Sequence, residues 1–380
     1  MPRTNIGTKI CILTSVHSPR DVRIFHKEAT SLAAAGYEVS IVAPHDQDEK
    51  VDAVQLKAVP AARGRLERMT RTAWRVYKAG VRQRACVYHL HDPELIPAGL
   101  LLKSQGRCVV YDVHEDLPRD ILDKDWIARW LRRPVAWVAG HFEVGLTSFF
   151  DAVVAATPSI ARRFPKEHTE TIQNYPNAQE LAVPGAAYAD RSFLLAYVGG
   201  VSKIRGARQV VEAMEFLPTE LRARCAIAGN WDPPELQHEL ASLTGWGFVD
   251  NLGWRSRAEV AGLLSRARIG ILMFQPVANH TESLPTKLFE YMSAGIPVIA
   301  SDFPLWKGII NSAGCGLVVD PSNPRAIAEA ASWLFQHPDE AEQMGRRGAA
   351  AIEARYTWAA EQTKLLALYS RLTSRESSQP

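Results

Sequence analysis

The chain has 380 residues, of which 47% are hydrophobic and 22% are charged, with 24 glycines and 23 prolines. These values are typical of a globular protein with room for two domains, and they exclude disordered, collagen-like and disulfide-stapled small proteins. Lysines and arginines number 44 against 41 aspartates and glutamates, a formal net charge of +3, which is too small for a dedicated nucleic-acid binder.

The first half of the chain repeats one pattern, a short apolar run that ends in polar residues and precedes a stretch long enough for a helix. The first run, residues 9–16, leads into a predicted helix over residues 25–35 that Gly36 closes. The later runs lie at residues 37–44, 86–92, 107–116 and 151–158. Continuous apolar runs of this length are typical of strands that are buried on both faces of a parallel sheet.

The same pattern restarts in the second half. Its apolar runs lie at residues 192–200, 225–230, 248–254, 268–274, 296–302 and 315–320. Between the halves, residues 173–190 contain Pro, Gly and Ala without periodicity, which predicts a linker. The predicted fold class is therefore α/β, with two doubly wound, Rossmann-like parallel sheets. Because ligands bind beyond the carboxyl ends of such strands, we expect the site in a cleft between the halves.

The cysteines and the amino terminus bear on location. The cysteines are Cys11, Cys86, Cys108, Cys225 and Cys315. They form no C-x-x-C pair, and four of them lie in or beside apolar runs, which predicts reduced, buried thiols. The apolar stretch near the amino terminus is too short for a signal sequence, and no run of about 18 apolar residues occurs. We therefore expect a cytoplasmic protein that is neither exported nor membrane-spanning.

The most informative segment is HTESLPTKLFEYMSAGIPVIAS, residues 280–301. Glu282 and Glu290 are eight positions apart in it, and Pro285 fits the first turn of a helix. The N–H groups of residues 283–286 would form an anion site at the positive end of this helix, suited to a diphosphate. The flanking carboxylates can accept hydrogen bonds from sugar hydroxyl groups. In the structural alternative, Glu282 caps the helix and Glu290 is a solvated charge.

With the following AGIPVIAS, this E-x7-E segment resembles the signature of family 4 retaining glycosyltransferases of the GT-B fold, and the resemblance covers nearly the whole chain. It implies that Glu282 contacts the donor sugar and Glu290 the ribose of a nucleotide diphosphate sugar. Lys287 lies in the same motif, either as a phosphate contact or as a surface lysine. The other donor-binding candidates of the motif are Ser283, Leu284, Pro285 and Thr286.

A second family signature matches in part the segment YVGGVSKIRGARQ, residues 197–209. The family usually has an arginine two residues after the strand and a lysine before a helix-opening glycine. Here Gly200 and Arg205 stand at these two positions. The resemblance implies that Arg205 clamps the diphosphate and offsets the charge that develops there. Lys203 is a candidate to replace the missing arginine, and Gly199 with Gly200 would let the backbone approach the phosphates.

In the first half, histidines and charged residues follow three strand ends, in HSPRDVRIFH, HLHDPE and DVHEDLP. The last of these resembles the family's third conserved loop, whose histidine lies against the donor sugar and the reacting centre. The resemblance therefore assigns that role to His114. Glu115 then positions the acceptor or holds His114, while His89 and His91 are expected to shape the acceptor pocket.

The first loop departs from the family because it lacks a glycine pair. Asp21 and Arg23 stand there instead, and we expect Arg23 to reach the cleft. Residues with a spacing seen in metal sites are His89, His91, Asp92 and His114. The resemblance nevertheless implies a metal-independent enzyme. It also implies retention at the anomeric carbon, with the departing diphosphate as the base.

A basic segment suggests a membrane surface. Residues 57–84 hold nine basic residues and one acid. If residues 66–81 are helical, one face carries Arg68, Arg71, Arg75, Lys78 and Arg82. In a second patch, Trp126 and Trp130 are predicted one helical turn apart, as in interfacial helices. An anionic membrane is the expected partner. The alternatives are a solvated face with the tryptophans in the core and, less favoured, a nucleic-acid site.

These observations predict an acceptor-side domain at residues 1–175, a nucleotide-sugar domain at residues 176–355 and a returning helix at residues 356–372, as in the family. The expected activity moves a hexose from a nucleotide diphosphate sugar to a saccharide or lipid-linked acceptor during assembly of a cell-surface polysaccharide or lipopolysaccharide, without a cofactor. One alternative is a sugar-nucleotide 2-epimerase of the same fold, which the E-x7-E spacing disfavours. The other is a catalytically silent nucleotide-sugar-binding subunit, suggested by Gly200 and the altered first loop.

Overall fold

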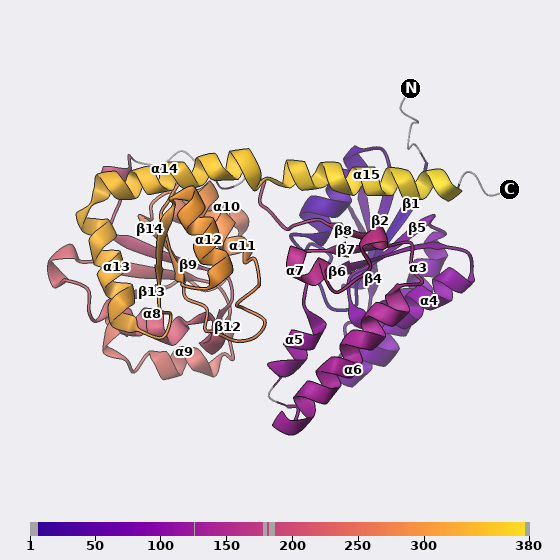
Figure 1. The fold of residues 1–380 in the computed structure, drawn as a ribbon, viewed down its shortest axis with the longest axis horizontal. Coiled ribbons are helices and arrows are strands. Elements are labelled where there is room, and N and C mark those ends of the chain that lie inside the picture. Colours follow the sequence, from indigo (N-terminus) through magenta and orange to yellow (C-terminus); the bar gives the residue numbers. More distant parts are fainter. Residues whose placement is uncertain (1–6, 125, 178–180, 182–186, 377–380) are drawn as a thin grey trace. The chain divides into compact units, whose positions relative to one another are not determined.

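The computed structural model describes residues 7–124, 126–177, 181 and 187–376. The chain divides into two compact units (Figure 1), unit 1 with Met1–Asn174 and Ala359–Pro380, and unit 2 with Tyr175–Trp358. Part of the predicted linker, residues 178–180 and 182–186, lies outside the described residues.

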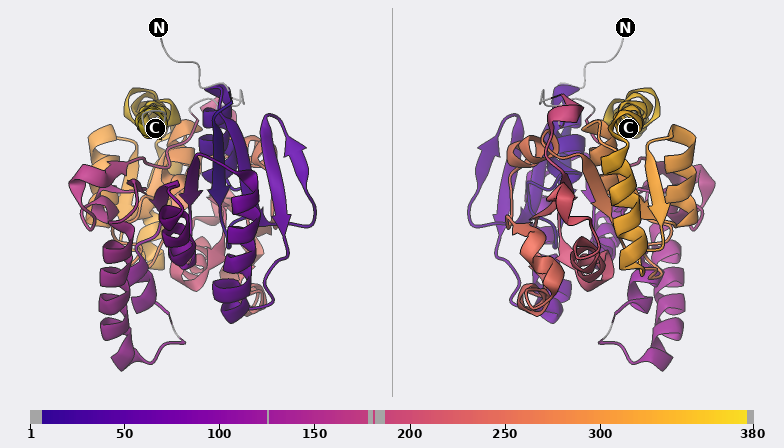
Figure 2. Two further views of the ribbon diagram at one scale, coloured as in Figure 1. Left: turned by 90° about the vertical axis from the view of Figure 1, so that its right-hand side faces the viewer. Right: turned by 90° about the vertical axis from the view of Figure 1, so that its left-hand side faces the viewer.

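Unit 1 is built on a sheet whose described strands run in the order β3-β4-β2-β1-β5-β6-β7-β8. The strands are β1 (Lys9–Leu13), β2 (Glu38–Pro44), β3 (Glu49–Val51), β4 (Val54–Val59), β5 (Val87–Leu90), β6 (Cys108–Val113), β7 (Ala152–Ala155) and β8 (Thr169–Thr171). Neighbours pair in parallel, except for β3 and β4, an antiparallel pair at the edge (Figure 2).

The helices of unit 1 include two π-helical segments that the sequence did not predict. The helical elements are η1 (Ile24–Ala29), α1 (Thr30–Ala34), α2 (Arg65–Glu67), η2 (Arg68–Thr72), α3 (Ala73–Gln83), η3 (Pro93–Leu95), α4 (Ile96–Ser104), α5 (Leu117–Leu122), α6 (Arg129–Thr147), α7 (Pro158–Ala161), η4 (Lys166–His168) and α15 (Trp358–Glu376).

The predicted helix over residues 25–35 is formed by η1 and α1, and Gly36 follows with a φ of 93°. Trp126 lies in a turn before α6, so the prediction that Trp126 and Trp130 lie one turn apart on a helix is wrong.

Unit 2 is built on a parallel sheet of order β13-β11-β9-β14-β15-β16, with a separate pair β10-β12. The strands are β9 (Leu194–Val198), β10 (Val201–Ser202), β11 (Arg224–Ala228), β12 (Trp231–Asp232), β13 (Val249–Asn251), β14 (Ile269–Leu272), β15 (Val298–Ser301) and β16 (Gly316–Val319). Along β9, Leu195 and Tyr197 pack into the core on one face of the sheet, and Ala196 and Val198 into that on the other. This two-sided burial is what continuous apolar runs predict.

The helices of unit 2 cover both faces of its sheet. They are η5 (Tyr188–Asp190), η6 (Lys203–Arg205), α8 (Ala207–Met214), η7 (Thr219–Leu221), α9 (Glu235–Leu240), η8 (Thr244–Phe248), α10 (Arg257–Leu264), α11 (Thr286–Ser293), α12 (Pro304–Ala313), α13 (Pro324–Gln336) and α14 (Pro338–Arg355). In the described part of the chain, every helix falls short of the length and apolarity that crossing a bilayer requires.

Helix α15 packs on unit 1, although it follows unit 2 in the sequence. Its Glu361 accepts a hydrogen bond of 2.8 Å from the Gln173 N–H group. The Tyr369 hydroxyl lies 2.7 Å from Nδ1 of His89, and the Tyr369 side chain is fully buried. Residues that come late in the sequence thus complete the interior of unit 1.

All five cysteines are free thiols. Cys11, Cys225 and Cys315 are buried, and burial raises the pKa of each, to about 12, about 12 and about 11. Cys86 and Cys108 are only half-buried. The prediction of buried thiols is therefore right for three of the five and wrong for the other two.

Candidate functional site

The helix start predicted to bind an anion lies in unit 2, at α11. Helix α11 begins at Thr286, and the residue at its N-cap position is Pro285, not Glu282. The Ser283 N–H group donates to the His280 carbonyl oxygen at 3.1 Å and is not available to a ligand. Leu284 packs against the core. The predicted anion site therefore narrows to the first turn at Thr286, where helices leave N–H groups without an intrahelical acceptor.

Two cationic side chains converge beside this helix start. Nη1 of Arg205 and Nζ of Lys287 each lie 3.4 Å from the Gly200 carbonyl oxygen. The Phe274 ring centroid lies 5.6 Å from the Arg205 guanidinium carbon and 5.5 Å from Nζ of Lys287. Within the described residues, neither cation forms an ion pair with a carboxylate. Arg205 and the protonated form of Lys287 therefore offer positive charge to an anionic ligand beside the Phe274 ring.

Lys287 is 8% exposed, which excludes the alternative of a surface lysine. Burial and the neighbouring Arg205 charge lower the pKa of Lys287 to about 7. An anion between the two cations would favour the charged form of this lysine and raise its pKa. Binding of a diphosphate at neutral pH would therefore be accompanied by proton uptake.

The two glycines of the second signature make room for these cations. Gly199 has a φ of 84°, and a Cβ there would lie 2.7 Å from Cε of Lys287. A Cβ on Gly200 would collide with Nη1 of Arg205. The Gly199 N–H group donates to the Ala228 carbonyl at 2.8 Å. The glycines therefore admit the Lys287 and Arg205 side chains, and the expectation that they also let the backbone approach the phosphates stays a prediction.

The remaining donor-side candidates differ in their surroundings. Lys203 lies 2.8 Å from Glu239, and its side chain is 60% exposed, so it does not replace the missing arginine. Glu282 is half-buried in the loop before α11. Glu290 is 7% exposed and accepts a 2.6 Å hydrogen bond from Arg257, the first residue of α10. Glu290 is therefore not a solvated charge. No motif in the sequence signals Arg257, which the sequence analysis missed.

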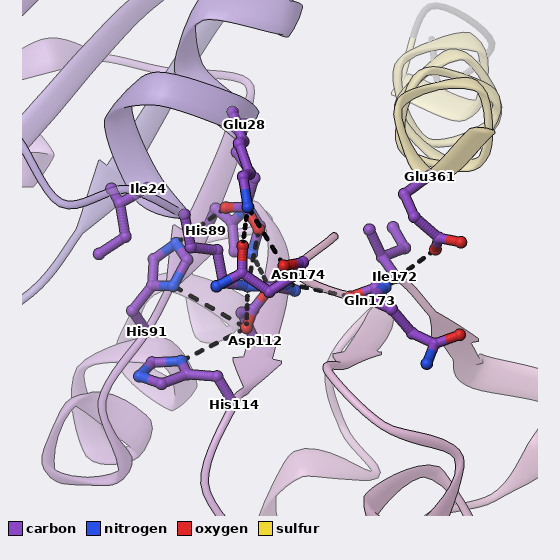
Figure 3. Close-up of polar contacts among 12 residues, drawn as sticks. Ile24, Glu28, His89, His91, Asp112, His114, Ile172, Gln173, Asn174 and Glu361 are labelled. Atoms are coloured by element: carbon purple, nitrogen blue, oxygen red, sulfur yellow. Dashed lines mark hydrogen bonds and ion pairs between the residues drawn. The ribbon is translucent and has the colours of Figure 1, made fainter. Parts of the chain in front are cut away.

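A buried polar network occupies unit 1 beyond the carboxyl ends of β5 and β6. Figure 3 shows Glu28, His89, His91 and His114 around Asp112. Nε2 of His89 lies 3.6 Å from Oδ2 of Asp112, and Nε2 of His91 lies 3.2 Å from Oε2 of Glu28. His89 and His91 are 0% and 2% exposed. His89 and His91 therefore lie too deep to contact an acceptor, and the expectation that they shape the acceptor pocket stays a prediction.

Arg23 lies inside this network. It is 4% exposed, and its guanidinium lies 2.7 Å from Asp112 and 3.0 Å from Glu28. The expectation that Arg23 reaches a cleft is therefore wrong, because two buried carboxylates hold it in the interior. Asp21 accepts the N–H groups of Arg23 and Ile24 at 2.8 and 3.1 Å, so its carboxylate fixes the start of η1.

Burial sets the protonation of this network. Burial raises the pKa of Glu28 to about 8 against the opposing effect of Arg23, and it lowers the pKa of His91 to about 3. Although burial opposes it, the Arg23 charge helps to hold the pKa of Asp112 well below its usual range. Because the pKa of Glu28 is raised on folding, its stabilising contribution is complete in acid and is lost as the pH rises through about 8.

The same residues offer a possible set of metal ligands. Atoms of Glu28, His89, His91 and Asp112 lie within 4.8 Å of one another. The Arg23 guanidinium, however, already contacts both carboxylates. A metal ion would have to lie beside this fixed positive charge, so the network is better described as neutralised by arginine.

His114 and Glu115 lie at the surface end of the network. Glu115 is exposed, and the His114 side chain is 21% exposed. Nδ1 of His114 lies 3.5 Å from Asp112, and its Nε2 lies 2.9 Å from Nε2 of His17. Of the residues predicted for the acceptor side, Glu115 is exposed and Asp21 half-buried, and His114, predicted as catalytic, is half-buried beside them. His17 was missed, although it follows a strand end as the other histidines do.

Family models match both units. One described as "Glycosyl transferase 4-like domain" covers residues 22–174, and one described as "Glycosyl transferases group 1" covers residues 184–351. The D-rhamnosyltransferase WbpZ of Pseudomonas aeruginosa is 28% identical over 221 residues, 54% of this chain and 54% of that protein. The O-antigen chain mannosyltransferase B of Escherichia coli is 24% identical over 223 residues, 58% of this chain and 53% of that protein. The chain thus spans about half the length of the curated relatives it matches.

Solved structures share the fold over the whole chain. Sucrose-phosphate synthase from Thermosynechococcus elongatus has a TM-score of 0.80 at 18% identity, covering 97% of this chain and 100% of that one. Anabaena HepE with UDP-glucose has a TM-score of 0.74 at 13% identity, covering 96% and 99%. These likenesses confirm the predicted fold class. The chain belongs to the GT-B glycosyltransferases of the family 4 type.

Proposed function

We propose that this chain is a retaining hexosyltransferase that moves a sugar from a nucleotide diphosphate sugar to a saccharide or lipid-linked acceptor, without a metal ion. The setting that we propose is the assembly of a cell-surface polysaccharide or lipopolysaccharide. The names of two relatives, a rhamnosyltransferase and an O-antigen chain mannosyltransferase, favour this setting.

The observation that carries this proposal is the pair Arg205 and Lys287, which lie side by side without a carboxylate partner among the residues that the structure describes. A leaving diphosphate gains negative charge as its bond to the anomeric carbon breaks. Two cations held beside the start of α11 stabilise that charge more in the transition state than in the ground state. They also supply the positive charge for which other transferases use a divalent ion, which is why we propose metal-independent chemistry.

The other donor-side residues take supporting roles in this proposal. Glu290 accepts a hydrogen bond from the ribose while Arg257 holds its carboxylate in place. Glu282 accepts hydrogen bonds from the donor sugar, and His114 lies at the reacting centre. The acceptor hydroxyl attacks from the side of the leaving diphosphate, whose oxygen takes the hydroxyl proton, so that configuration is retained without a side-chain nucleophile.

Binding of the donor tests this function directly. With EDTA present, we expect one of the UDP, GDP or ADP sugars to raise the thermal unfolding temperature. A ligand at about 100 times its Kd stabilises the fold by about 2.7 kcal/mol. We expect the shift to vanish in Glu290→Ala and to persist in Glu353→Ala, a change at an exposed carboxylate of α14.

The outcomes separate the alternatives. A shift that appears only when a divalent ion replaces EDTA would contradict the metal-independent proposal. Donor binding without transfer or donor hydrolysis would favour the silent subunit, and a new sugar nucleotide formed without acceptor would favour the 2-epimerase. The absence of any shift, in a folded protein, would remove the support for a donor site in unit 2.

We also propose that unit 1 contacts an anionic membrane. Trp126, Trp130 and Trp137 are 63%, 78% and 65% exposed, so the alternative that buries these tryptophans is wrong. The Arg65 guanidinium lies 5.1 Å from the Trp126 ring, which joins the basic segment to the aromatic one. Aromatic rings beside basic residues suit the interface of an anionic bilayer, where each basic residue contributes about 1 kcal/mol.

The basic face differs in part from its prediction. Arg68 and Arg75 are ion-paired with Glu94 and Glu67, at 2.8 and 3.5 Å. The π-helical turn of η2 changes the angular step between residues, so the helix-period pattern does not hold through it. The exposed cations that remain on this face are Arg71, Lys78 and Arg82.

We expect the variant with Trp130→Ala and Trp137→Ala to bind phosphatidylserine-containing vesicles at least about tenfold more weakly than wild type. Burial of one large apolar side chain is worth about 1.5–3 kcal/mol, and about 1.4 kcal/mol is tenfold in affinity. Vesicle sedimentation measures the change. Trp254→Ala, which removes a 66% exposed tryptophan of unit 2, is the control. Equal binding of all three proteins would contradict the membrane proposal.

A further inference from the structure

Two histidines of unit 1 face each other, and each has its own carboxylate. Nε2 of His17 lies 2.9 Å from Nε2 of His114. The same atom of His17 lies 3.3 Å from Oδ1 of Asp92, and Nδ1 of His114 lies 3.5 Å from Oδ1 of Asp112. The two side chains are 25% and 21% exposed, whereas Asp92 and Asp112 are buried. The result is an array in which two imidazoles meet between two carboxylates.

The contact between the two rings admits one hydrogen. Two nitrogens 2.9 Å apart form a hydrogen bond when one donates and the other offers its lone pair. Nδ1 of His114 lies 3.5 Å from the ionised Asp112 carboxylate without a hydrogen bond to it, and this negative charge favours Nδ1 as the nitrogen that carries the hydrogen of a neutral His114 ring. The lone pair of His114 is then on Nε2, and the donor must be His17.

The loop after β1 is built to keep Asp92 charged beside His17. Oδ2 of Asp92 accepts from the Thr14 hydroxyl at 2.8 Å, from the Ser15 N–H group at 2.6 Å and from the Val16 N–H group at 3.3 Å. The Ser15 hydroxyl donates to the same oxygen at 3.2 Å. These donors leave Oδ1 for His17, so the second carboxylate has a dedicated imidazole partner.

Charged groups from several neighbouring elements surround the pair. They are Asp21 from the loop before η1, His91 and Asp92 just after β5, Asp112 from β6 and Glu115 from the loop after it. Arg23, at the start of η1, acts on Asp112 and His91. Burial by itself would lower the pKa of His17, but the hydrogen bond and charge of Asp92, with the charges of Asp21 and Glu115, outweigh it and raise this pKa.

We propose that His17 is a positioning residue for His114. Held by Asp92, His17 donates its Nε2–H group to Nε2 of His114, so that the two imidazoles share one proton and His114 is fixed as the Nδ1–H form. The protonated His17 ring also places a positive charge beside Nε2 of His114. This inference rests on the proposed function, because the role of His114 at the reacting centre belongs to that proposal. His17 acts through His114, which it orients and polarises by the Nε2–H···Nε2 hydrogen bond. The charge on His17 is present below its raised pKa and is lost as the pH rises through it.

Protein with ¹⁵N-labelled histidine tests the shared proton without any substrate. In long-range ¹H–¹⁵N spectra at pH 6 with EDTA, below the ordinary pKa of a histidine, we expect both nitrogens of His17 to be protonated and His114 to be protonated at Nδ1 alone. The assignments come from His17→Gln and His114→Gln. Two neutral rings at pH 6 would overturn the proposal. The proposal would also be overturned if spectra recorded before EDTA is added show Zn²⁺ bound by the two Nε2 atoms.

Kinetics test the consequence for His114. We expect His17→Ala to lower kcat at least about tenfold with donor and acceptor KM within about twofold. In wild type, kcat should fall at basic pH as His17 loses its proton, and we expect this basic limb of the pH profile to disappear in His17→Ala. Glutamine donates a hydrogen bond but does not titrate, so His17→Gln should recover part of kcat at pH 7 without recovering that limb. His26→Gln, a change at an exposed histidine of η1, is the control. An unchanged basic limb in His17→Gln would overturn the proposal.

Failure of the proposed function is distinguishable from failure of this inference. If wild type has no transferase activity, the spectra alone decide whether His17 and His114 share a proton. If wild type is active and the spectra show no shared proton, the inference fails while the function stands.

Discussion

Arg205→Ala is expected to lower kcat of the proposed transferase about 10²–10³-fold, the usual result of removing one group that stabilises developing negative charge. Its guanidinium lies beside Lys287 at Gly200 and has no carboxylate partner among the described residues. We expect donor KM to rise as well, because the same cation binds the ground-state diphosphate. The measurement is steady-state transfer with the donor that the thermal shift identifies.

Arg208→Ala is the matched control for this result. Arg208 lies on α8 and is held at the surface by Glu212 and Glu239, so its removal should leave kcat within about twofold, as expected for a surface pair. Arg205→Lys should fall between alanine and wild type, since a lysine keeps the charge but not the planar fork of donors. An Arg205→Ala enzyme as active as the control would mean that the diphosphate charge is met elsewhere, and Arg205 would then be an ordinary loop cation.

Arg23→Met is expected to lower the free energy of unfolding of unit 1 by about 3–5 kcal/mol, the usual effect of removing one partner from a buried ion pair. Methionine keeps much of the side-chain volume but leaves Asp112 and Glu28 facing each other without a cation. Asp112, whose pKa the arginine charge helps to hold low, would then bind a proton more readily, so the loss should shrink as the pH falls. Hydrogen exchange of the β1, β5 and β6 amides measures the stability of this unit.

Arg20→Met supplies the comparison. Arg20 pairs with Glu49 at the surface, where its side chain is 55% exposed, and exposed pairs are worth about 0–1 kcal/mol. If both variants lose the same small amount, the buried network does not hold unit 1 together. If Arg23→Met loses the same free energy of unfolding relative to wild type at pH 5 and at pH 8, the charge of Asp112 is not coupled to the arginine.

The strands could be predicted because burial on both faces leaves a continuous apolar run, whereas a strand with one solvated face alternates apolar and polar residues. Packing along β9 confirms this, since neighbouring residues of one strand enter different cores. Helix phase was less predictable. The π-helical turn Arg68–Thr72, and the start of α6 at Arg129 rather than before Trp126, depend on local packing that the residue pattern does not predict.

The candidate site was predictable where a motif fixes both the residue type and its place. Lys287 in the first turn of α11 and Glu290 farther along it are both buried, as a ligand-binding motif requires. Residues that act through other residues were not predictable in the same way. Arg257 is an ordinary helix-starting arginine in the sequence, and Arg23 looks like a loop charge until its two carboxylate partners appear. Such roles depend on contacts between segments far apart in the chain.

The sequence nevertheless contained a signal for the buried polar network of unit 1. His89 lies on β5 with His91 just after it, Asp112 lies on β6 with His114 just after it, and these two strands are neighbours. Side chains two positions apart share a face of a strand, so their convergence follows from the strand order. What the sequence lacked was the strand order itself and the return of α15 to this region.

That return has a consequence for biosynthesis. Glu361 and Tyr369, which contact Gln173 and His89 of unit 1, are translated only after all of unit 2. A nascent chain therefore holds an unfinished unit 1, with His89 lacking its Tyr369 partner, throughout the synthesis of the second half. Domains usually fold as they emerge, in order from the amino terminus, but here the unit made first is the unit finished last. A chain whose synthesis stops within α15 would lack these contacts in the interior of unit 1, far away in the sequence, while unit 2 would be complete.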